Sequence, residues 1–351
     1  MDTIIQKVNK DSFREEELEK ACEILRSGGL VAFPTETVYG LGGDALSQEA
    51  AKKIYEAKGR PSDNPLIIHI ADIDNLYDVA EQVSGKATAL AEAFWPGPLT
   101  MIFPKAEKVP LSTTGGLNTV AVRMPIHPVA AALIRRSGIY IAAPSANASG
   151  RPSPTKAEHV IEDMDGRIHM VLDGGQVGIG IESTIVDMTE DIPVILRPGY
   201  ITKEKIEKVI GAVEIDPAVI ANEPKKDLIA KAPGMKYRHY APKGQMTIVE
   251  GDQEKVVAAI NSLVQEKEGE GRRTAVIATE ESKRFYRCKK VYCIGSRKNE
   301  GSIAAGLYDI LRQMDHIGAE YIYAESFVED TLGQAIMNRM LKAAGYNRIS
   351  V

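Results

Sequence analysis

Cationic and amide side chains gather in one constrained stretch of this sequence, KGRPSDNPLIIHI at residues 58–70. Lys58 and Arg60 precede the first of two prolines, Asn64 precedes the second, and His69 interrupts an apolar run. Lysine and arginine bind phosphate and carboxylate groups, and proline restricts the backbone beside it. The stretch therefore indicates an anion site on backbone with little freedom.

A second polar stretch, IAAPSANASGRPSPT at residues 141–155, begins as an apolar strand and continues in small hydroxyl and amide residues. Backbone N–H groups and short side chains such as Ser145 and Asn147 can hold a phosphate or a nucleobase closely. Loops rich in Ser, Asn and Pro are also common without any such role, so both interpretations stay open for this stretch taken alone.

Two single arginines stand where apolar strands are expected to end, Arg123 in AVRMP and Arg197 in ILRPG. Ligands of α/β sheets bind at strand ends, and arginine there suits a carboxylate or a phosphate. A solvated strand end is the alternative for either residue. In the glycine-rich segment 173–187, turns explain most glycines, and Ser183 and Thr184 at the start of a strand are the residues to watch.

Several other patterns are not expected to carry chemistry. GLGGDA at residues 40–45 matches a dinucleotide fingerprint, but PTETVY separates it from the preceding apolar run, so we predict a plain turn. Three cysteines form neither a disulfide framework nor a zinc site. Four isolated histidines are also left without a role: His127, His159, His169 and His316.

The elements that must position these residues form an α/β pattern. An amphipathic helix is predicted over 12–28, and a helix with a Ser N-cap and a glycine end over 47–59. Some connections between strands are too short for crossovers, so the sheet should be mixed. After a weakly periodic, linker-like segment at 211–243, residues 244–351 alternate as a small Rossmann-like domain. Strands are predicted in the first part at LVAFPTETVYG, NPLIIHI, LTMIFP, TVAVRMP, IYIAAPS, MVLDGG, STIVDM and PVILRPG.

Composition bounds the class of protein. The 351 residues favour two domains, and no apolar run is long enough to cross a membrane, so we expect a cytoplasmic protein with no membrane contact. The net charge of −5 divides into −7 over 1–210, +2 over 211–243 and 0 over 244–351. This balance, and the expected absence of a basic or aromatic stripe, argue against broad nucleic-acid binding.

Taken together, several motifs resemble one family, the L-threonylcarbamoyladenylate synthases. The resemblance rests on FPTETVYGLG, KGRPSDNPLIIHI, FWPGPLT, VAVRMP, AAPSANASGRPSPT, ESTIVD and LRPG, in that order, and continues through APGMKYRHYAP into the C-terminal part. It implies an α/β fold with a twisted mixed-sheet YrdC-like domain and a concave cavity over 1–210. It also implies a linker over the active site at 211–243 and a Rossmann-like domain over 244–351.

The resemblance further implies a nucleotidyltransferase that makes threonylcarbamoyl-AMP and pyrophosphate from L-threonine, bicarbonate or CO₂, and ATP with Mg²⁺. No protein residue is assigned to the metal. Other proteins then transfer the threonylcarbamoyl group to tRNA, with which weak contact is expected. The implied catalytic set is Lys58, Arg60, Ser145 and Asn147. Threonine is assigned to Thr35, His69, Arg123 and Ser183, and ATP to Lys58, Asn64, Thr119, Ala143, Ser145, Ser153, Arg197 and His239.

Two rival functions are kept. A double-stranded RNA or ribosome-binding module would show RNA affinity with a steep salt dependence and no ATP turnover. Carbamoyl activation for another acceptor, as in hydrogenase-maturation relatives of this fold, would not depend on threonine. We also expect the linker around His239 and Tyr240 to act as a lid that keeps water from labile intermediates.

Overall fold

A computed structural model describes residues 2–220, 230–233, 240–328 and 331–351. Contacts divide the chain into two compact units. The first comprises residues 1–149 and 153–236, and the second comprises 150–152 and 237–351. The predicted His239 site residue lies outside the described residues.

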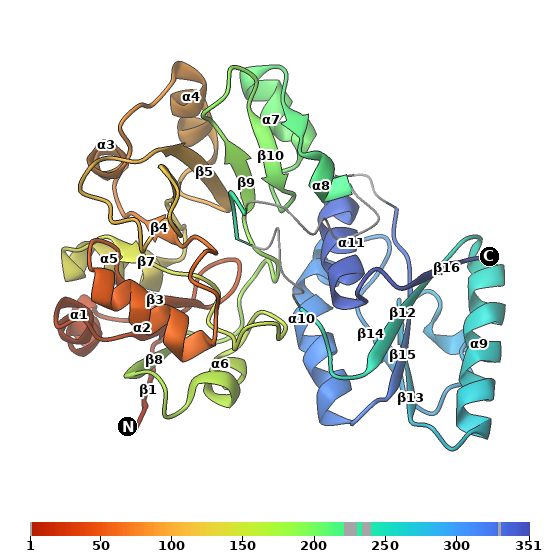
Figure 1. Ribbon diagram of the computed structural model, residues 1–351. Coiled ribbons are helices and arrows are strands. Elements are labelled where there is room, and N and C mark those ends of the chain that lie inside the picture. Colours follow the sequence, from red (N-terminus) through yellow and green to blue (C-terminus); the bar gives the residue numbers. More distant parts are fainter. Residues whose placement is uncertain (1, 221–229, 234–239, 329–330) are drawn as a thin grey trace. The chain divides into compact units, whose positions relative to one another are not determined.

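The first unit is built on a sheet of eleven strands in the order β1-β8-β2-β3-β7-β4-β6-β5-β9-β10-β11 (Figure 1). Parallel pairs such as β4 with β6 alternate with antiparallel pairs such as β5 with β6. The predicted mixed sheet is therefore confirmed. The strands are β1 (Ile4–Lys7), β2 (Val31–Phe33), β3 (Gly40–Asp44), β4 (Ile67–His69), β5 (Leu99–Pro104), β6 (Thr119–Arg123), β7 (Ile141–Ala142), β8 (Met170–Asp173), β9 (Thr184–Asp187), β10 (Val194–Arg197) and β11 (Glu214–Ile215).

The helix expected after Ser47 forms as predicted. In α2 (Gln48–Lys58) the Ser47 hydroxyl accepts a hydrogen bond from Ala50 N at 3.2 Å, and Gly59 ends the helix in the left-handed region at φ 62°. The helix expected over 12–28 begins later, as the short 3₁₀ turn η1 (Glu15–Leu18) followed by α1 (Glu19–Arg26). The remaining helices are η2 (Ile73–Asn75), α3 (Leu76–Val79), α4 (Gly85–Phe94), α5 (Pro128–Ser137), α6 (Ala157–Met164), α7 (Lys203–Ile210) and α8 (Pro217–Ile220).

GLGGD is a strand, β3, and the predicted plain turn is wrong. It pairs antiparallel with β2 and with β7 in the middle of the sheet. A Cβ added at Gly42 would lie 2.7 Å from Ile141 Cγ2 and 2.8 Å from Phe33 Cε1. The glycines therefore allow neighbouring side chains to pack closely against β3. Their spacing matches the dinucleotide fingerprint, but they lie in a paired strand and not in a phosphate-binding turn.

The two faces of this sheet are covered differently. Alternation along β2 sends Val31 and Phe33 to a cluster that includes α1 and α5, whereas Ala32 joins the larger core that includes α2, α4 and α6. The strands from β4 to β10 place a separate apolar cluster on the face shared with Phe33. It consists of Ile67, Ile102, Ala121, Ile185, Leu196 and Ala232, with Val194 against it.

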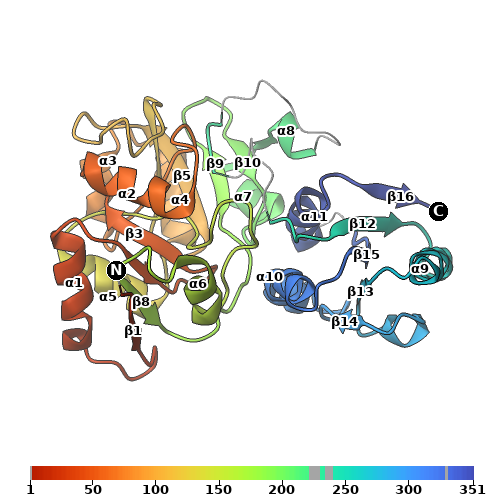
Figure 2. The ribbon, with the colours of Figure 1, turned by 60° about the horizontal axis from the view of Figure 1, so that its bottom comes forward.

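The second unit is a parallel sheet of five strands in the order β14-β13-β15-β12-β16. Figure 2 shows α9 (Gln253–Gly269) on one face of it, with α10 (Glu300–His316) and α11 (Thr331–Ala343) on the other. The predicted parallel α/β architecture is confirmed, although β15 lies between β12 and β13, which differs from the common Rossmann order. The strands are β12 (Gln245–Glu250), β13 (Thr274–Ala278), β14 (Val291–Cys293), β15 (Tyr321–Glu325) and β16 (Arg348–Ser350), and η3 (Lys283–Phe285) precedes β14.

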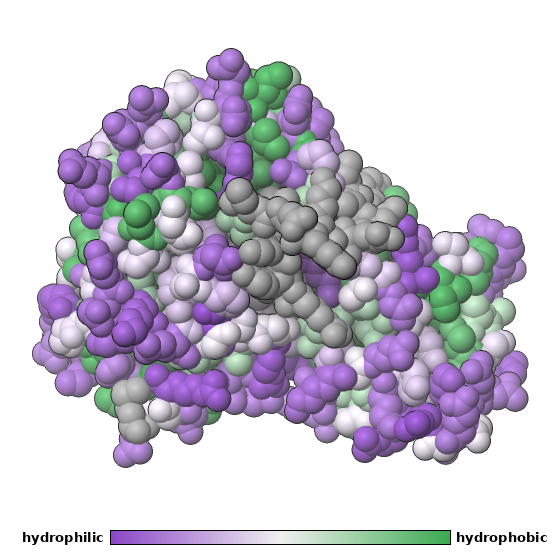
Figure 3. Space-filling view, in the orientation of Figure 1, coloured by the Kyte–Doolittle hydropathy of each residue, from purple (hydrophilic) through white to green (hydrophobic). Residues whose placement is uncertain are grey.

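Hydrophilic side chains predominate on the face drawn in Figure 3, and hydrophobic ones form only small areas there. Within the described ranges, no helix combines the length and the apolar character that a membrane crossing requires.

Candidate active site

The end of α2 and the loop after β7 form the first part of the site. Because β4 and β7 are antiparallel, the segment that precedes β4 and the segment that follows β7 meet at one edge of the sheet. Lys58, the last residue of α2, is buried and donates from Nζ to Ser145 O and Asn147 O. The Ser145 hydroxyl donates to Asn147 Oδ1 at 2.5 Å. Lys58 thus contacts two other residues of the predicted phosphate-binding set, which lie 87 and 89 positions away in the sequence.

Arg60 and Asn64 lie on the same segment as Lys58. Arg60 donates from Nε to Asn64 O at 3.3 Å and from Nη2 to Pro65 O at 3.1 Å. Asn64 is 2 % exposed, and its Oδ1 has no hydrogen-bond partner in the described part of the chain. A buried amide oxygen without a partner is unfavourable, so Asn64 is suited to a ligand that donates a hydrogen bond.

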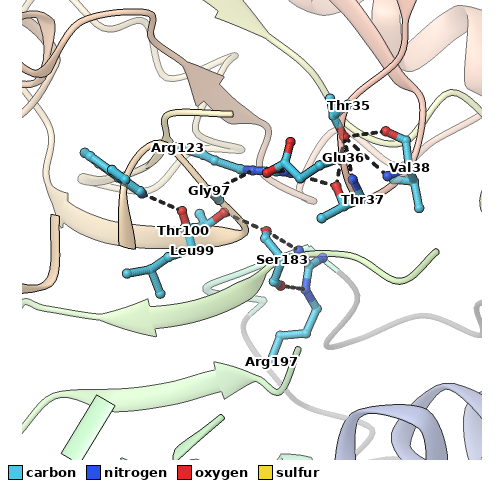
Figure 4. A network of polar contacts seen from close by, with 11 residues as sticks. Thr35, Glu36, Thr37, Val38, Gly97, Leu99, Thr100, Arg123, Ser183 and Arg197 are labelled. Atoms are coloured by element: carbon cyan, nitrogen blue, oxygen red, sulfur yellow. Dashed lines mark hydrogen bonds and ion pairs between the residues drawn. The ribbon is translucent and has the colours of Figure 1, made fainter. Parts of the chain in front are cut away.

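The loop between β2 and β3 forms the second part of the site. Thr35 Oγ1 donates to Val38 O at 2.6 Å and lies 3.2 Å from Thr37 N, so the hydroxyl closes a compact turn. Figure 4 shows that this turn directs Glu36 and Thr37 toward Arg123. The sequence analysis assigned Thr35 and did not single out Glu36 or Thr37.

Arg123, the last residue of β6, is held by three acceptors. It donates from Nη2 to Glu36 Oε1 at 2.5 Å, from Nη1 to Thr37 Oγ1 at 3.0 Å and from Nε to Gly97 O at 3.4 Å. A guanidinium has five N–H donors, so two of them have no acceptor among the residues that the structure describes. Its side chain is 5 % exposed, and that of Glu36 is 11 % exposed. Arg123 and Glu36 thus form a buried ion pair in which some N–H groups of the guanidinium are not used by the described residues.

Ser183 and Arg197 form the third part of the site (Figure 4). Ser183 Oγ lies 2.7 Å from Thr100 Oγ1, and Arg197 donates to it from Nη2 at 3.1 Å. Arg197 also donates from Nε to Ser183 O at 3.0 Å and from Nη1 to Pro233 O at 3.4 Å. Thr100 contacts a predicted site residue, and although it ends the FWPGPLT motif it was given no role from sequence.

His69 ends β4 opposite Arg123 in the neighbouring strand. Burial, and secondly the Arg123 charge, lower the pKa of His69 to about 3. Its Nδ1 lies 3.1 Å from Ile67 O. His69 is therefore a neutral ring at physiological pH and can contact a substrate without adding charge.

Backbone hydrogen bonds join the loop after β2 to the loop after β7. Tyr39 N donates to Pro154 O at 2.9 Å, and Ala146 N donates to Tyr39 O at 2.8 Å. The loop after β7, which contacts Lys58, and the loop after β2, which contacts Arg123, are thus joined directly within the first unit. The other predicted residues are Ala143 directly after β7, Thr119 at the start of β6, and Ser153, whose hydroxyl donates to Glu182 Oε1 at 2.6 Å.

Comparison with known proteins identifies the family. A family described as "Telomere recombination" matches residues 23–199, and one described as "Threonylcarbamoyl-AMP synthase, C-terminal domain" matches residues 201–345. The threonylcarbamoyl-AMP synthase of Bacillus subtilis (strain 168) is 52% identical over 335 residues, which cover 95% of this chain and 94% of that protein. The chain belongs to the threonylcarbamoyl-AMP synthase family.

The similarity to this synthase family extends over both units. The synthase of Pyrococcus abyssi is 50% identical over 349 residues, 99% of this chain and 100% of that protein. A crystal structure of P. abyssi Sua5 complexed with L-threonine matches with a TM-score of 0.94 at 50% identity, over 99% of this chain and 100% of that one. A doubly substituted variant of the same protein also matches at 0.94, with 49% identity over 99% and 98% of the two chains.

Proposed function

We propose that this chain is a nucleotidyltransferase that makes threonylcarbamoyl-AMP and pyrophosphate from L-threonine, bicarbonate or CO₂, and ATP. The observation that carries the proposal is the buried Arg123, two of whose N–H groups have no acceptor among the described residues. Thr35 and Ser183 belong to the same network of polar contacts (Figure 4). The fold around it is shared with a protein whose structure contains L-threonine. The proposed product is the donor from which other, threonylcarbamoyl-transferring proteins modify tRNA.

Threonine is assigned to the Arg123 part of the site. The forked guanidinium suits the substrate carboxylate, and the Thr35 and Ser183 hydroxyls can bond its polar groups. Neutral His69 adds a ring surface without a competing charge.

ATP is assigned to the Lys58 part of the site. Lys58, Arg60, Ser145 and Asn147 supply a cation and donor set for the phosphates. The nucleotide is further assigned to Asn64, Thr119, Ala143, Ser153, Arg197 and His239, of which His239 lies outside the described residues.

In this reaction the protein mainly positions the substrates and stabilises charge on the phosphates. A carbamate oxygen attacks the α-phosphorus of ATP, the bond to the bridging oxygen breaks, and pyrophosphate leaves with that electron pair. Fixed cations and N–H donors stabilise the charge that develops on phosphate oxygens, so no side-chain nucleophile is needed.

Magnesium is proposed to arrive with ATP. Magnesium in nucleotide sites is usually held by substrate phosphates, one or two carboxylates and water. When bound, Mg²⁺ neutralises charge on the phosphates. Lys58 and Arg60 hold the same phosphates from the protein side.

Pyrophosphate release with L-threonine, bicarbonate and ATP, omitting each in turn, tests the proposed function. Release should require all three and should fall at least 100-fold in Lys58→Ala, because a fixed phosphate cation is lost. Release without threonine would indicate another carbamoyl acceptor. Absence of release under every condition would overturn the proposal and favour the RNA-binding alternative.

We also propose that the second unit contacts RNA, because its segment 283–298 contains seven Lys or Arg and no Asp or Glu. This local excess of positive charge lies in a part of the chain, 244–351, whose net charge is zero. The exposed cations Lys283, Arg284, Arg287, Lys289, Lys290 and Lys298 form no ion pair with any residue that the structure describes. Arg284 lies over the ring of the exposed Phe285, 4.8 Å from its centroid.

Lysines near an edge strand such as β14 can also serve only to prevent strand pairing between molecules. Replacing Lys283, Arg284, Lys289 and Lys290 by serine separates the two roles. The RNA proposal predicts weaker tRNA binding and a shallower salt dependence in anisotropy titrations. Unchanged tRNA affinity, with increased self-association, would support the edge-protection role instead.

A further inference from the structure

Glu36 has one carboxylate oxygen that the protein does not use. Oε1 accepts from Arg123, but Oε2 is buried and has no hydrogen-bond partner among the residues that the structure describes. Arg123 needs only Oε1 for its position. A buried carboxylate oxygen left without a donor is unfavourable, so this oxygen is suited to a ligand that supplies an N–H.

The ion pair matches the charges of a free α-amino acid. Carboxylate and ammonium groups of such a ligand stand on one carbon atom, and Arg123 and Glu36 stand side by side (Figure 4). A carboxylate on the two remaining N–H groups of Arg123 brings the ammonium close to Glu36. Each ligand charge then faces an opposite charge in the protein.

On the basis of the proposed function, we propose that Glu36 binds the ammonium of L-threonine and removes one of its protons, which makes the nitrogen nucleophilic. The N–H bond breaks, its electron pair stays on nitrogen, and Glu36 becomes a neutral carboxylic acid. The nitrogen then forms the C–N bond with CO₂ while one C–O π pair moves onto oxygen. A second N–H proton leaves to water, which gives the carbamate, and Glu36 returns its proton to water.

Two histidine rings are the other groups near this ion pair that could accept a proton. Burial, and secondly the charge of Arg123, keeps the pKa of His69 at about 3. Burial lowers the pKa of His127 to about 4, although the Glu36 charge opposes that shift. Both rings are therefore neutral at pH 7 and hold a proton weakly, and Glu36 is the carboxyl group in contact with the Arg123 guanidinium.

The test compares Glu36→Gln with wild type from pH 7 to pH 9.5, at saturating L-threonine, bicarbonate and ATP. The amide oxygen can still accept from Arg123 but cannot take a proton. Pyrophosphate release should fall at least 100-fold at pH 7. The defect should shrink by about tenfold per pH unit as threonine loses its proton to solvent instead. Changes in dissolved CO₂ affect both proteins and cancel in the ratio.

Thr37→Val is the matched control, because it removes another Arg123 partner without changing a base. Its defect should be the same at every pH. Glu36→Asp, which retains a carboxylate, should recover part of the activity at pH 7 and a profile like that of wild type. A wild-type to Glu36→Gln ratio that stays constant with pH would overturn the proposal and leave a positioning role only. Failure of threonine-dependent release in wild type would instead overturn the proposed function.

Discussion

Arg123 shows how one residue can depend on contacts far away in sequence. Its acceptors come from Glu36 and Thr37, more than 80 positions upstream, and from Gly97 in the FWPGPLT turn. These contacts fix the guanidinium before any ligand binds, so little side-chain freedom is lost on binding. Lysine has the same charge but no fork.

Arg123→Lys should therefore weaken threonine binding by about 30-fold, or about 2 kcal/mol, the value of a lost charge-assisted hydrogen bond. Isothermal titration with L-threonine measures this. ATP binding to the same variant serves as the control and should change little. Unchanged threonine affinity would contradict the assignment of the carboxylate to Arg123.

Buried histidines make stability depend on pH. The folded pKa values of His69 and His127, about 3 and about 4, lie below the ordinary value of 6.5 because both rings are buried. The unfolded chain binds these protons first, so the free energy of unfolding should fall as pH drops below 6.5. Each histidine should cost about 2 kcal/mol between pH 7 and pH 5.

Urea unfolding of wild type and His127→Gln at both pH values checks this. The variant should lose about 2 kcal/mol less than wild type on acidification. Equal losses in the two proteins would show that His127 is protonated as readily in the folded state as in the unfolded chain.

At the scale of elements, continuous apolar runs predicted the longer strands well. The runs around β5, β6 and β9 were identified because apolar residues bounded by turn signals are typical of buried strands. Strands β1, β11 and β16 were not identified. They are short or exposed, and pairing with a neighbour defines them more than their own pattern does. GLGGD was not predicted to form β3, because the reason for glycine in a strand is the close approach of side chains from neighbouring strands. That approach is visible only in the folded structure.

Gly42→Ala tests that explanation of β3. Contacts of 2.7 and 2.8 Å would force Ile141 or Phe33 to move, and such overpacking should cost about 1–3 kcal/mol. Gly85→Ala is the matched control, since no atom lies within 4 Å of a Cβ there and the residue begins α4. It should leave the urea midpoint unchanged or raise it. Equal effects of the two substitutions would refute close packing as the reason for Gly42.

The described part of the linker-like segment supports the lid hypothesis at one place. Ala232 is fully buried in the apolar cluster with Ile67 and Ile185, which lie two positions along the chain from the predicted threonine-binding residues His69 and Ser183. We propose that it helps to exclude water. Ala232→Glu should disturb this packing and increase ATP consumption that yields no threonylcarbamoyl-AMP. The ratio of AMP formed to product measures it. Lys231→Ser, which removes the ion pair of Lys231 with Asp187 but leaves the apolar cluster intact, is the neighbouring control. An unchanged ratio would argue against the lid.

At the scale of the whole molecule, the order of the sequence motifs predicted more of the fold and of the site than the distribution of charge did. The two α/β architectures and the contact of Lys58 with Ser145 and Asn147 were expected from sequence. Glu36 was not, because its significance depends on its contact with Arg123, 87 positions away, and on a carboxylate oxygen without a partner among the described residues, and neither can be read from the local sequence. The basic segment 283–298 was overlooked because acidic residues elsewhere bring the charge of 244–351 to zero.

The central claim is that one chain joins threonine, inorganic carbon and ATP in a single product. Incubation with ¹³C-bicarbonate, L-threonine and ATP, followed at once by mass spectrometry, tests it most directly. We expect threonylcarbamoyl-AMP with one ¹³C atom, dependent on all three substrates and nearly absent with Lys58→Ala. ATP consumption without a labelled adenylate, or a labelled adenylate that forms without threonine, would contradict it.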